Sequence, residues 1–187
     1  MWDIIKWTFW LLIWCAVGAF LWYTLPRNDV VRITDTYEKR VDPGDNSLFW
    51  ANSNTGESTT TTGYDVFFIQ AMSPKDKPRV YRNEDTGWGW PPYFKFDTSN
   101  LQAEAADLKS TKENPRWVVV KKYGWRVPYL SIYPNAVSVR PVAGPDVVVI
   151  PWISLAILFI LGCLVVAIWS RWRKFRTNRI DPLLDFE

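Results

Sequence analysis

Carboxylates are the only generic acid–base candidates in this sequence, and a group of them lies between residues 84 and 107. Glu84 and Asp85 are neighbours, and further acids follow at Asp97, Glu104 and Asp107. Two carboxylates can serve as general acid and base when both reach one substrate. Adjacent residues on a strand point to opposite faces, however, so neighbours in sequence do not by themselves form such a pair. We expect these acids mainly on solvated turn and helix surfaces.

The other residue types that catalysis commonly uses are missing or misplaced. The 187-residue chain contains no histidine and two cysteines, and both cysteines fall inside long apolar runs. Ser-His hydrolases, His-containing zinc sites and ordinary haem ligation are therefore excluded. Gly87-Trp88-Gly89 has no phosphate-loop lysine around it, and the pattern GxGxxG does not occur. We expect no catalytic residue, no cofactor, no metal and no disulfide.

An aromatic segment, NEDTGWGWPPYFKFD at residues 83–97, is the strongest candidate for recognition. Its rings could stack on a sugar or contact a protein partner, with the carboxylates as hydrogen-bond acceptors. They could equally pack in a core or rest on a membrane surface. In an extended chain, Trp88 and Trp90 would project to one face, opposite Gly87 and Gly89. The candidate interaction surface comprises Glu84, Asp85, Trp88, Trp90, Tyr93 and Phe94.

Two apolar runs, residues 7–25 and 147–169, enclose everything else. A hydrocarbon core of roughly 30 Å takes about 20 helical residues, so each run predicts a transmembrane helix. A cleaved signal peptide is the alternative for the first run, but the run continues well past the small residues at 16–18. Rings that suit the headgroup level flank both runs. These are Trp2, Trp7, Trp22, Tyr23, Trp152, Trp169 and Trp172.

Charge placement predicts the orientation. The net charge is only +3, which gives no reason to expect a nucleic-acid partner. A basic cluster directly follows the second run, and the positive-inside bias places such a cluster in the cytoplasm. Its members are Arg171, Arg173, Lys174, Arg176 and Arg179. We therefore expect residues 1–6 and 170–187 to be cytoplasmic, and residues 26–146 to be periplasmic in a bacterial inner membrane.

The two cysteines suggest a contact between the predicted helices. Cys15 and Cys163 lie at similar depths when counted from the outer ends of the two runs. Each begins a small-xxx-small pair, Cys15 with Ala19 and Cys163 with Ala167, and this spacing lets transmembrane helices approach closely. These four residues are the candidate helix–helix contact.

The intervening residues predict a β-rich α+β domain. Alternating and β-branched segments, bounded by turn residues, indicate five or six strands in a mixed or antiparallel sheet or a small barrel. The expected strands are 29–41, 64–72, 79–82, 116–123, 125–133 and 136–142. Residues 42–63 are polar and turn-rich, which predicts a long loop.

One soluble helix is expected within this domain. Ser99 and Gln102 fit a capping box, which predicts a helix that begins there and ends near Lys112. Leu101, Ala105 and Leu108 fall on one face of it. That face should pack against the sheet.

Four stretches of the sequence carry a family resemblance that spans nearly the whole chain, including both apolar runs. They are 82–110, 123–126 (YGWR), 130–136 (LSIYPNA) and 140–145 (RPVAGP). On these residues the chain resembles an alphaproteobacterial inner-membrane family known only as a domain of unknown function. The resemblance implies a bacterial source and a periplasmic central domain, and it carries no activity, cofactor or catalytic residue with it.

We therefore expect a non-enzymatic, membrane-anchored interaction module or an accessory subunit of an inner-membrane complex. Its partners would be the lipid bilayer and another envelope protein, or a second copy of itself. The alternative is a ligand-binding domain for a sugar or envelope component, or a carboxylate-dependent enzyme. An open cleft that unites the acids and rings would favour that alternative.

Overall fold

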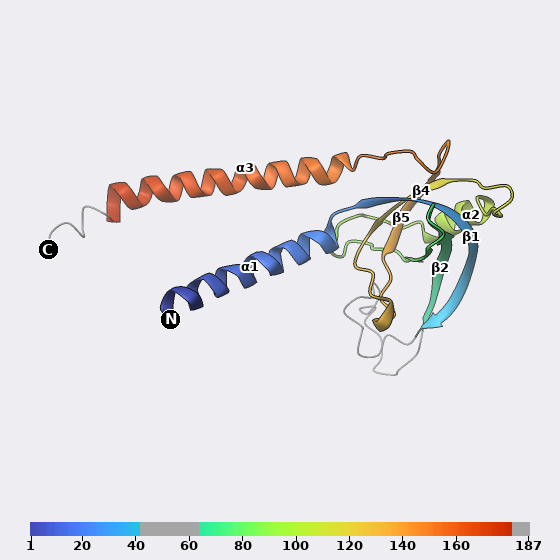
Figure 1. Cartoon of the computed structure of the whole chain (residues 1–187), viewed down its shortest axis with the longest axis horizontal. Coiled ribbons are helices and arrows are strands. Elements are labelled where there is room, and N and C mark those ends of the chain that lie inside the picture. Colours follow the sequence, from blue (N-terminus) through green and yellow to red (C-terminus); the bar gives the residue numbers. More distant parts are fainter. Residues whose placement is uncertain (42–63, 181–187) are drawn as a thin grey trace. The chain divides into compact units, whose positions relative to one another are not determined.

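The computed structural model describes residues 1–41 and 64–180. These residues form two units, one ending at Ile150 and one beginning at Pro151, which are described separately. The first contains a long helix and a β-barrel, and the second contains a single long helix (Figure 1). The loop predicted at residues 42–63 and the last residues of the tail, 181–187, lie outside the described part of the chain.

Helix α1 (Trp2–Thr24) includes the first apolar run. It begins five residues before Trp7, so the residues expected to precede the span are also helical. It ends where Leu25 turns to an extended conformation, because the residue before a proline is biased away from helical geometry. None of its residues is buried inside the protein, and it is long and apolar enough to cross a membrane.

Helix α3 (Trp152–Phe175) is followed by a short π-helical stretch, η3 (Arg176–Ile180). It begins after Pro151, which has no N–H and fits the start of a helix, so residues 147–150 of the apolar run are not helical. It continues beyond Trp169 through Arg173 and Lys174, since arginine and lysine are good helix formers. It too is long and apolar enough to cross a membrane.

Five strands close into a barrel, in the order β1-β2-β3-β5-β4. The β3–β5 pair is parallel, at Arg82 and Asn135, and the other four pairs are antiparallel. The sheet-rich α+β region between two apolar helices is therefore confirmed. The strands are β1 (Arg27–Val41), β2 (Tyr64–Met72), β3 (Pro78–Asn83), β4 (Val118–Tyr123) and β5 (Asn135–Pro141).

The strand predicted at residues 125–133 is wrong. A short 3-10 helix, η2 (Pro128–Leu130), takes its place, with an isolated bridge between Val127 and Ile132. Pro128 has no N–H to give to a sheet ladder, and Ser131 has a left-handed φ of 54°. Both features suit a turn better than a strand.

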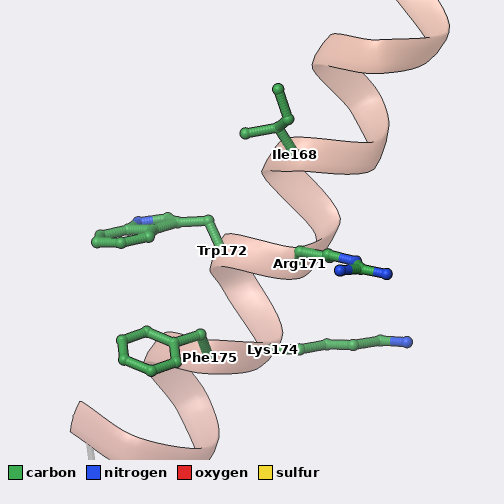
Figure 2. A pocket seen from close by; sticks show the side chains of 5 residues that line it. All are labelled: Ile168, Arg171, Trp172, Lys174 and Phe175. Carbon is green, nitrogen blue, oxygen red and sulfur yellow. The ribbon is translucent and has the colours of Figure 1, made fainter.

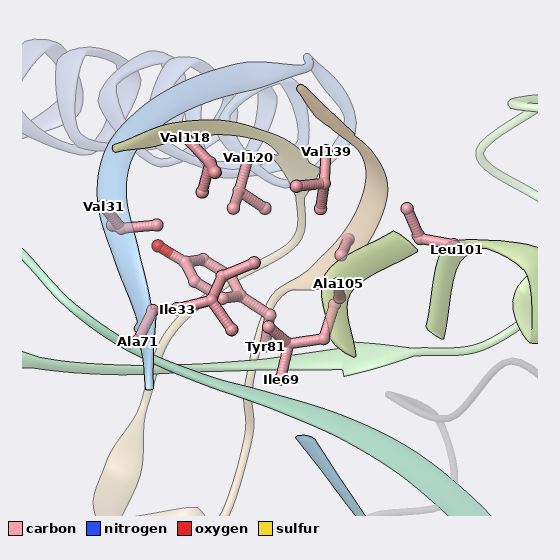
Figure 3. Close-up of a cluster of buried hydrophobic side chains, with 11 residues drawn as sticks. Val31, Ile33, Ile69, Ala71, Tyr81, Leu101, Ala105, Val118, Val120 and Val139 are labelled. Carbon is pink, nitrogen blue, oxygen red and sulfur yellow. The ribbon is translucent and has the colours of Figure 1, made fainter. Parts of the chain in front are cut away.

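Helix α2 (Thr98–Asp107) packs against the barrel through the predicted apolar face. Leu101 and Ala105 are buried and point toward the aliphatic side chains of the strands (Figure 3). They belong to one core of eleven residues: Val31, Ile33, Ile69, Ala71, Tyr81, Leu101, Ala105, Val118, Val120, Ala136 and Val139.

The start and end of α2 differ from the prediction. The capping box is wrong, because Asp97 is the N-cap and Asp85 accepts hydrogen bonds from the Thr98 N–H (3.0 Å) and hydroxyl (2.6 Å). The Gln102 side chain instead accepts from Asn83 at 3.0 Å. The helix ends at Asp107, five residues before Lys112.

Candidate functional site

The aromatic segment lies against the last turns of α1. Tyr93 stacks on Tyr123 of β4, with ring centroids 4.7 Å apart, and its hydroxyl donates to the carbonyl of Thr24. Trp90 stacks on Phe20 at 5.6 Å and an interplanar angle of 14°. Burial raises the pKa of Tyr93, which therefore stays a neutral hydrogen-bond donor. The segment is thus fixed both to the barrel and to the helix.

A second loop reaches the same helix. Trp125 Nε1 donates to the carbonyl of Ala19 at 3.3 Å, and its ring meets Tyr23 edge-on at 5.5 Å. The Gly124 N–H donates to the carbonyl of Tyr23 at 2.9 Å. Gly124 has φ +96°, a left-handed conformation that favours glycine. Two loops therefore clamp the end of α1.

The first strand residue completes this clamp. Arg27 lies over the ring of Trp22 at 4.2 Å and donates to the carbonyl of Gly124 at 2.7 Å. Burial lowers the pKa of Arg27, while the nearby Asp29 acts in the opposite direction. Since α1 runs into β1 with two residues between them, the barrel cannot swing freely about the helix.

Four rings of the aromatic segment remain open to the surroundings. The exposed fractions are 83% for Trp88, 62% for Trp90, 54% for Phe94 and 57% for Phe96. Trp88 meets Phe94 at 5.4 Å and Phe96 at 5.9 Å. We call these four residues the aromatic rim.

The premise of an extended segment around Trp88 and Trp90 is wrong. Residues 87–91 form turns, closed by a hydrogen bond from the Gly89 N–H to the carbonyl of Thr86 (3.0 Å). Consequently Trp88 joins Phe94 and Phe96, while Trp90 joins Phe20 of α1.

The two carboxylates of the predicted interaction surface, Glu84 and Asp85, are already engaged within the protein. Glu84 is buried and forms an ion pair with Arg82 at 3.0 Å. The Asp85 carboxylate accepts two hydrogen bonds from Thr98 at the start of α2. The six residues predicted as one interaction surface therefore fall into three environments. The rings of Trp88, Trp90 and Phe94 are exposed, Tyr93 is half-buried, and the two carboxylates are bound to other residues of the protein.

The residue that sequence reasoning missed is Lys95. It is 4% exposed, and its Nζ donates to Asn83 Oδ1, to the Ala136 carbonyl (3.0 Å) and to the Glu84 carbonyl (3.2 Å). An ammonium has three donors, so these three oxygens satisfy it. Burial lowers the pKa of Lys95 to about 8, against the opposing influence of Asp85, Asp97 and Glu84.

Asn135 ties the lysine site to the aromatic contacts. Its side chain accepts from the Glu84 N–H (3.0 Å) and donates to the Glu84 carbonyl (2.9 Å) and to the Tyr123 hydroxyl (3.0 Å). Burial raises the pKa of Tyr123 to about 12. No local pattern could have found Lys95, because residues 92–97 are not a strand and Phe94 has a left-handed φ of 50°, so strand alternation does not apply there.

A second polar cluster lies inside the barrel. Asp29 Oδ2 accepts from the Tyr81 hydroxyl at 2.8 Å and pairs with Lys122 Nζ at 2.5 Å. Burial, together with the charge of Asp29, raises the pKa of Tyr81 far above its ordinary value. Burial lowers the pKa of Lys122. Each of the three groups has a partner within the cluster, so we interpret the cluster as a structural part of the barrel.

The end of α3 carries a shallow hollow on the helix surface (Figure 2). Trp172 and Phe175 lie on one side of the helix, and Arg171 and Lys174 extend on the other. Arg173 lies over the Trp169 ring at 4.9 Å. Rings at headgroup level with cations reaching outward are typical of the end of a membrane span.

The structure does not test the predicted contact between the two long helices. Cys15 and Cys163 are free, exposed thiols within their own units, so their predicted contact stays a prediction. Among residues 1–41 and 64–180, no three His, Cys, Asp or Glu side chains are grouped so that they could hold a metal ion.

Comparison with known proteins confirms a family of unknown function over nearly the whole chain, whereas the alphaproteobacterial assignment stays a prediction. Residues 3–176 match the family model described as protein of unknown function (DUF1523). An uncharacterized protein from Haemophilus influenzae is 38% identical over 147 residues, which cover 78% of this chain and 79% of that protein. No solved structure matches.

Proposed function

The chain belongs to the DUF1523 family, and from this premise we propose that it is a membrane-anchored contact module of the bacterial inner membrane. Helices α1 and α3 span the bilayer, both termini are cytoplasmic, and residues 26–146 face the periplasm. The module acts without a chemical step, as an accessory subunit of a membrane complex or as a self-associating scaffold. It serves to hold a small barrel at a fixed place on the membrane surface.

The clamp between barrel and α1 is the observation that carries this proposal. A domain on a flexible tether could search for a soluble ligand, whereas this barrel is attached through Tyr93, Trp125 and Arg27 to one helix end. Fixed geometry lowers the entropy cost of binding a partner that is itself fixed in the membrane. The basic end of α3 supports the orientation, because such clusters remain on the cytoplasmic side.

The ligand-binding or enzymatic alternative has less support. It requires the acids and rings of residues 84–107 to converge on one open cleft. Instead, Glu84 is paired with Arg82, and Asp85 holds the start of α2. We therefore advance the contact module alone.

A topology experiment tests the orientation. A reporter that is active only in the periplasm should be active when fused after Asn54 and inactive when fused after Glu187. A second reporter, active only in the cytoplasm, should give the reverse pattern at the same two positions. Periplasmic activity at the C-terminus would overturn the orientation.

Purification tests the role. The full chain should be extracted in two different mild detergents, and its molar mass and co-purifying proteins should be quantified. An unrelated two-span protein with the same tag serves as the control. We expect either a partner in constant stoichiometry in both detergents or a defined oligomer. A monomer without a stoichiometric partner, both in detergent and in vesicles of native lipid, would overturn the contact role.

A further inference from the structure

We propose that the aromatic rim, Trp88, Trp90, Phe94 and Phe96, is a lipid-contacting seat that enters the outer leaflet of the bilayer beside α1. The inference rests on the proposed membrane insertion of α1 and goes beyond it, since a barrel could follow a transmembrane helix and still stand clear of the lipid. The occupant of this surface is phospholipid.

Depth along α1 provides the first argument. The apolar run, residues 7–25, is about 28 Å long at 1.5 Å per residue, so nearly all of it is needed to cross a core of roughly 30 Å. Phe20 then lies about 7 Å inside the outer end of that run. Trp90 stacks on this very ring, and Trp125 bonds to the carbonyl of the preceding residue, Ala19.

Moving the helix outward to keep these rings in water is unfavourable. If Phe20 marked the outer edge of the core, the span would have to include Asp3 and Lys6. A charged side chain costs up to about 3 kcal/mol at the centre of a span and less near its edge. The same shift would expose Leu21, Trp22 and Leu25 to water. The placement that keeps the apolar run in lipid therefore also places Trp90 in lipid.

The composition of the rim provides the second argument. Between Trp88 and Phe96 the only charged side chain is Lys95, and its ammonium is turned into the protein. The exposed residues of this stretch are the four rings, Gly89 and Pro92. Tryptophan and other rings suit the boundary between headgroups and acyl chains, where a charge facing outward would not.

Lipid is favoured over a protein as the occupant because the rim is continuous with the apolar surface of α1. The rim adjoins the exposed apolar surface of α1 through the Trp90–Phe20 stack, and lipid covers that surface in any inserted state. A protein partner would have to displace lipid from both surfaces together. A protein on the rim is therefore an outcome of the test.

Spin labels on cysteines can measure the depth of the rim in the full chain. The protein is reconstituted into vesicles of phosphatidylethanolamine and phosphatidylglycerol, and each label is exposed to oxygen, which concentrates in lipid, or to a water-soluble nickel chelate. Trp88→Cys in a Cys15→Ser, Cys163→Ser background reports on the rim. Ala103→Cys in the same background is the matched control, since it is exposed on α2, on the far side of the barrel from α1 (Figure 1). Native Cys15, with only Cys163→Ser, reports on α1 itself.

The three labels separate the possible outcomes. We expect the ratio of oxygen to nickel collisions to be several-fold higher at position 88 than at position 103, and highest at Cys15. A lipid-like ratio at Cys15 with a water-like ratio at position 88 would overturn the seat and leave the membrane anchor intact. A water-like ratio at Cys15 would overturn the anchor and the seat together. Shielding of position 88 from both reagents would also overturn the seat, because a protein surface would then cover the rim.

Discussion

Replacing Lys95 by methionine should destabilise the barrel and loosen the aromatic rim, although the change exchanges a buried charge for an apolar side chain of similar length. Three oxygens lose a donor in the variant. The Glu84 carbonyl keeps its bond from Asn135 at 2.9 Å, whereas Asn83 Oδ1 and the Ala136 carbonyl each lose the bond from the lysine.

The expected magnitude follows from these two acceptors. A buried polar group left without its partner costs about 1–3 kcal/mol, so two cost about 2–6 kcal/mol. Relief from holding a desolvated ammonium offsets part of this cost. We expect a net loss of up to about 3 kcal/mol at pH 7, equivalent to a fall in Tm of up to about 10 °C for a domain of this size.

The measurement is thermal unfolding of the full chain in detergent, followed by near-ultraviolet circular dichroism, which reports the packing of the barrel aromatics. Lys109→Met is the matched control, because its Nζ lies 2.9 Å from Asp35 in an exposed pair worth at most about 1 kcal/mol. A Lys95→Met protein as stable as the Lys109→Met protein would refute the reasoning, since the three oxygens would then not depend on the lysine. A spin label at position 88 should also become more mobile in Lys95→Met.

Three further predictions concern pH, the rim and the helices. The pKa of Lys95 is about 8 in the folded protein against an ordinary 10.5, so the unfolded chain binds more protons than the folded chain between these two pH values. The stability advantage of wild type over Lys95→Met should therefore grow by up to about 3 kcal/mol as the pH rises through that window. A stability difference that stays constant with pH would contradict the lowered pKa. Trp88→Ala with Trp90→Ala should leave the barrel resistant to protease, because both rings are largely exposed; degradation would show that they support the core. A short, membrane-permeable crosslinker should join Cys15 to Cys163 within one chain, and products only between chains would place that contact between two copies.

The rim and Lys95 belong to one arrangement. Lys95 is drawn into the protein by oxygens from β3, β5 and the segment between β3 and α2, and this withdrawal leaves Phe94 and Phe96 facing outward. A buried and satisfied ammonium thus keeps charge away from the surface that we assign to lipid. The lysine acts on the rim by positioning it.

The local pattern of the sequence determined the elements. The two apolar runs predict α1 and α3, because helix length and hydrocarbon thickness leave little choice. Alternation predicts the five strands, and the spacing of Leu101 and Ala105 predicts the buried face of α2. Local pattern misled where a proline or a left-handed residue interrupts a β-rich segment, as at Pro128 and Ser131.

Only the tertiary structure decided how the aromatic segment is used. Tyr93 and Thr24 are 69 residues apart in sequence, and Trp125 and Ala19 are 106 apart, so no local spacing relates them. Similarly, the three oxygens that surround Lys95 come from residues 83, 84 and 136. The free energy of a buried charge depends on the acceptors that closure of the barrel brings to it, and these exist only once the strands have paired. The sequence therefore predicts an aromatic segment between two apolar helices, whereas the paired strands decide which of its rings face outward and which of its charges turns in.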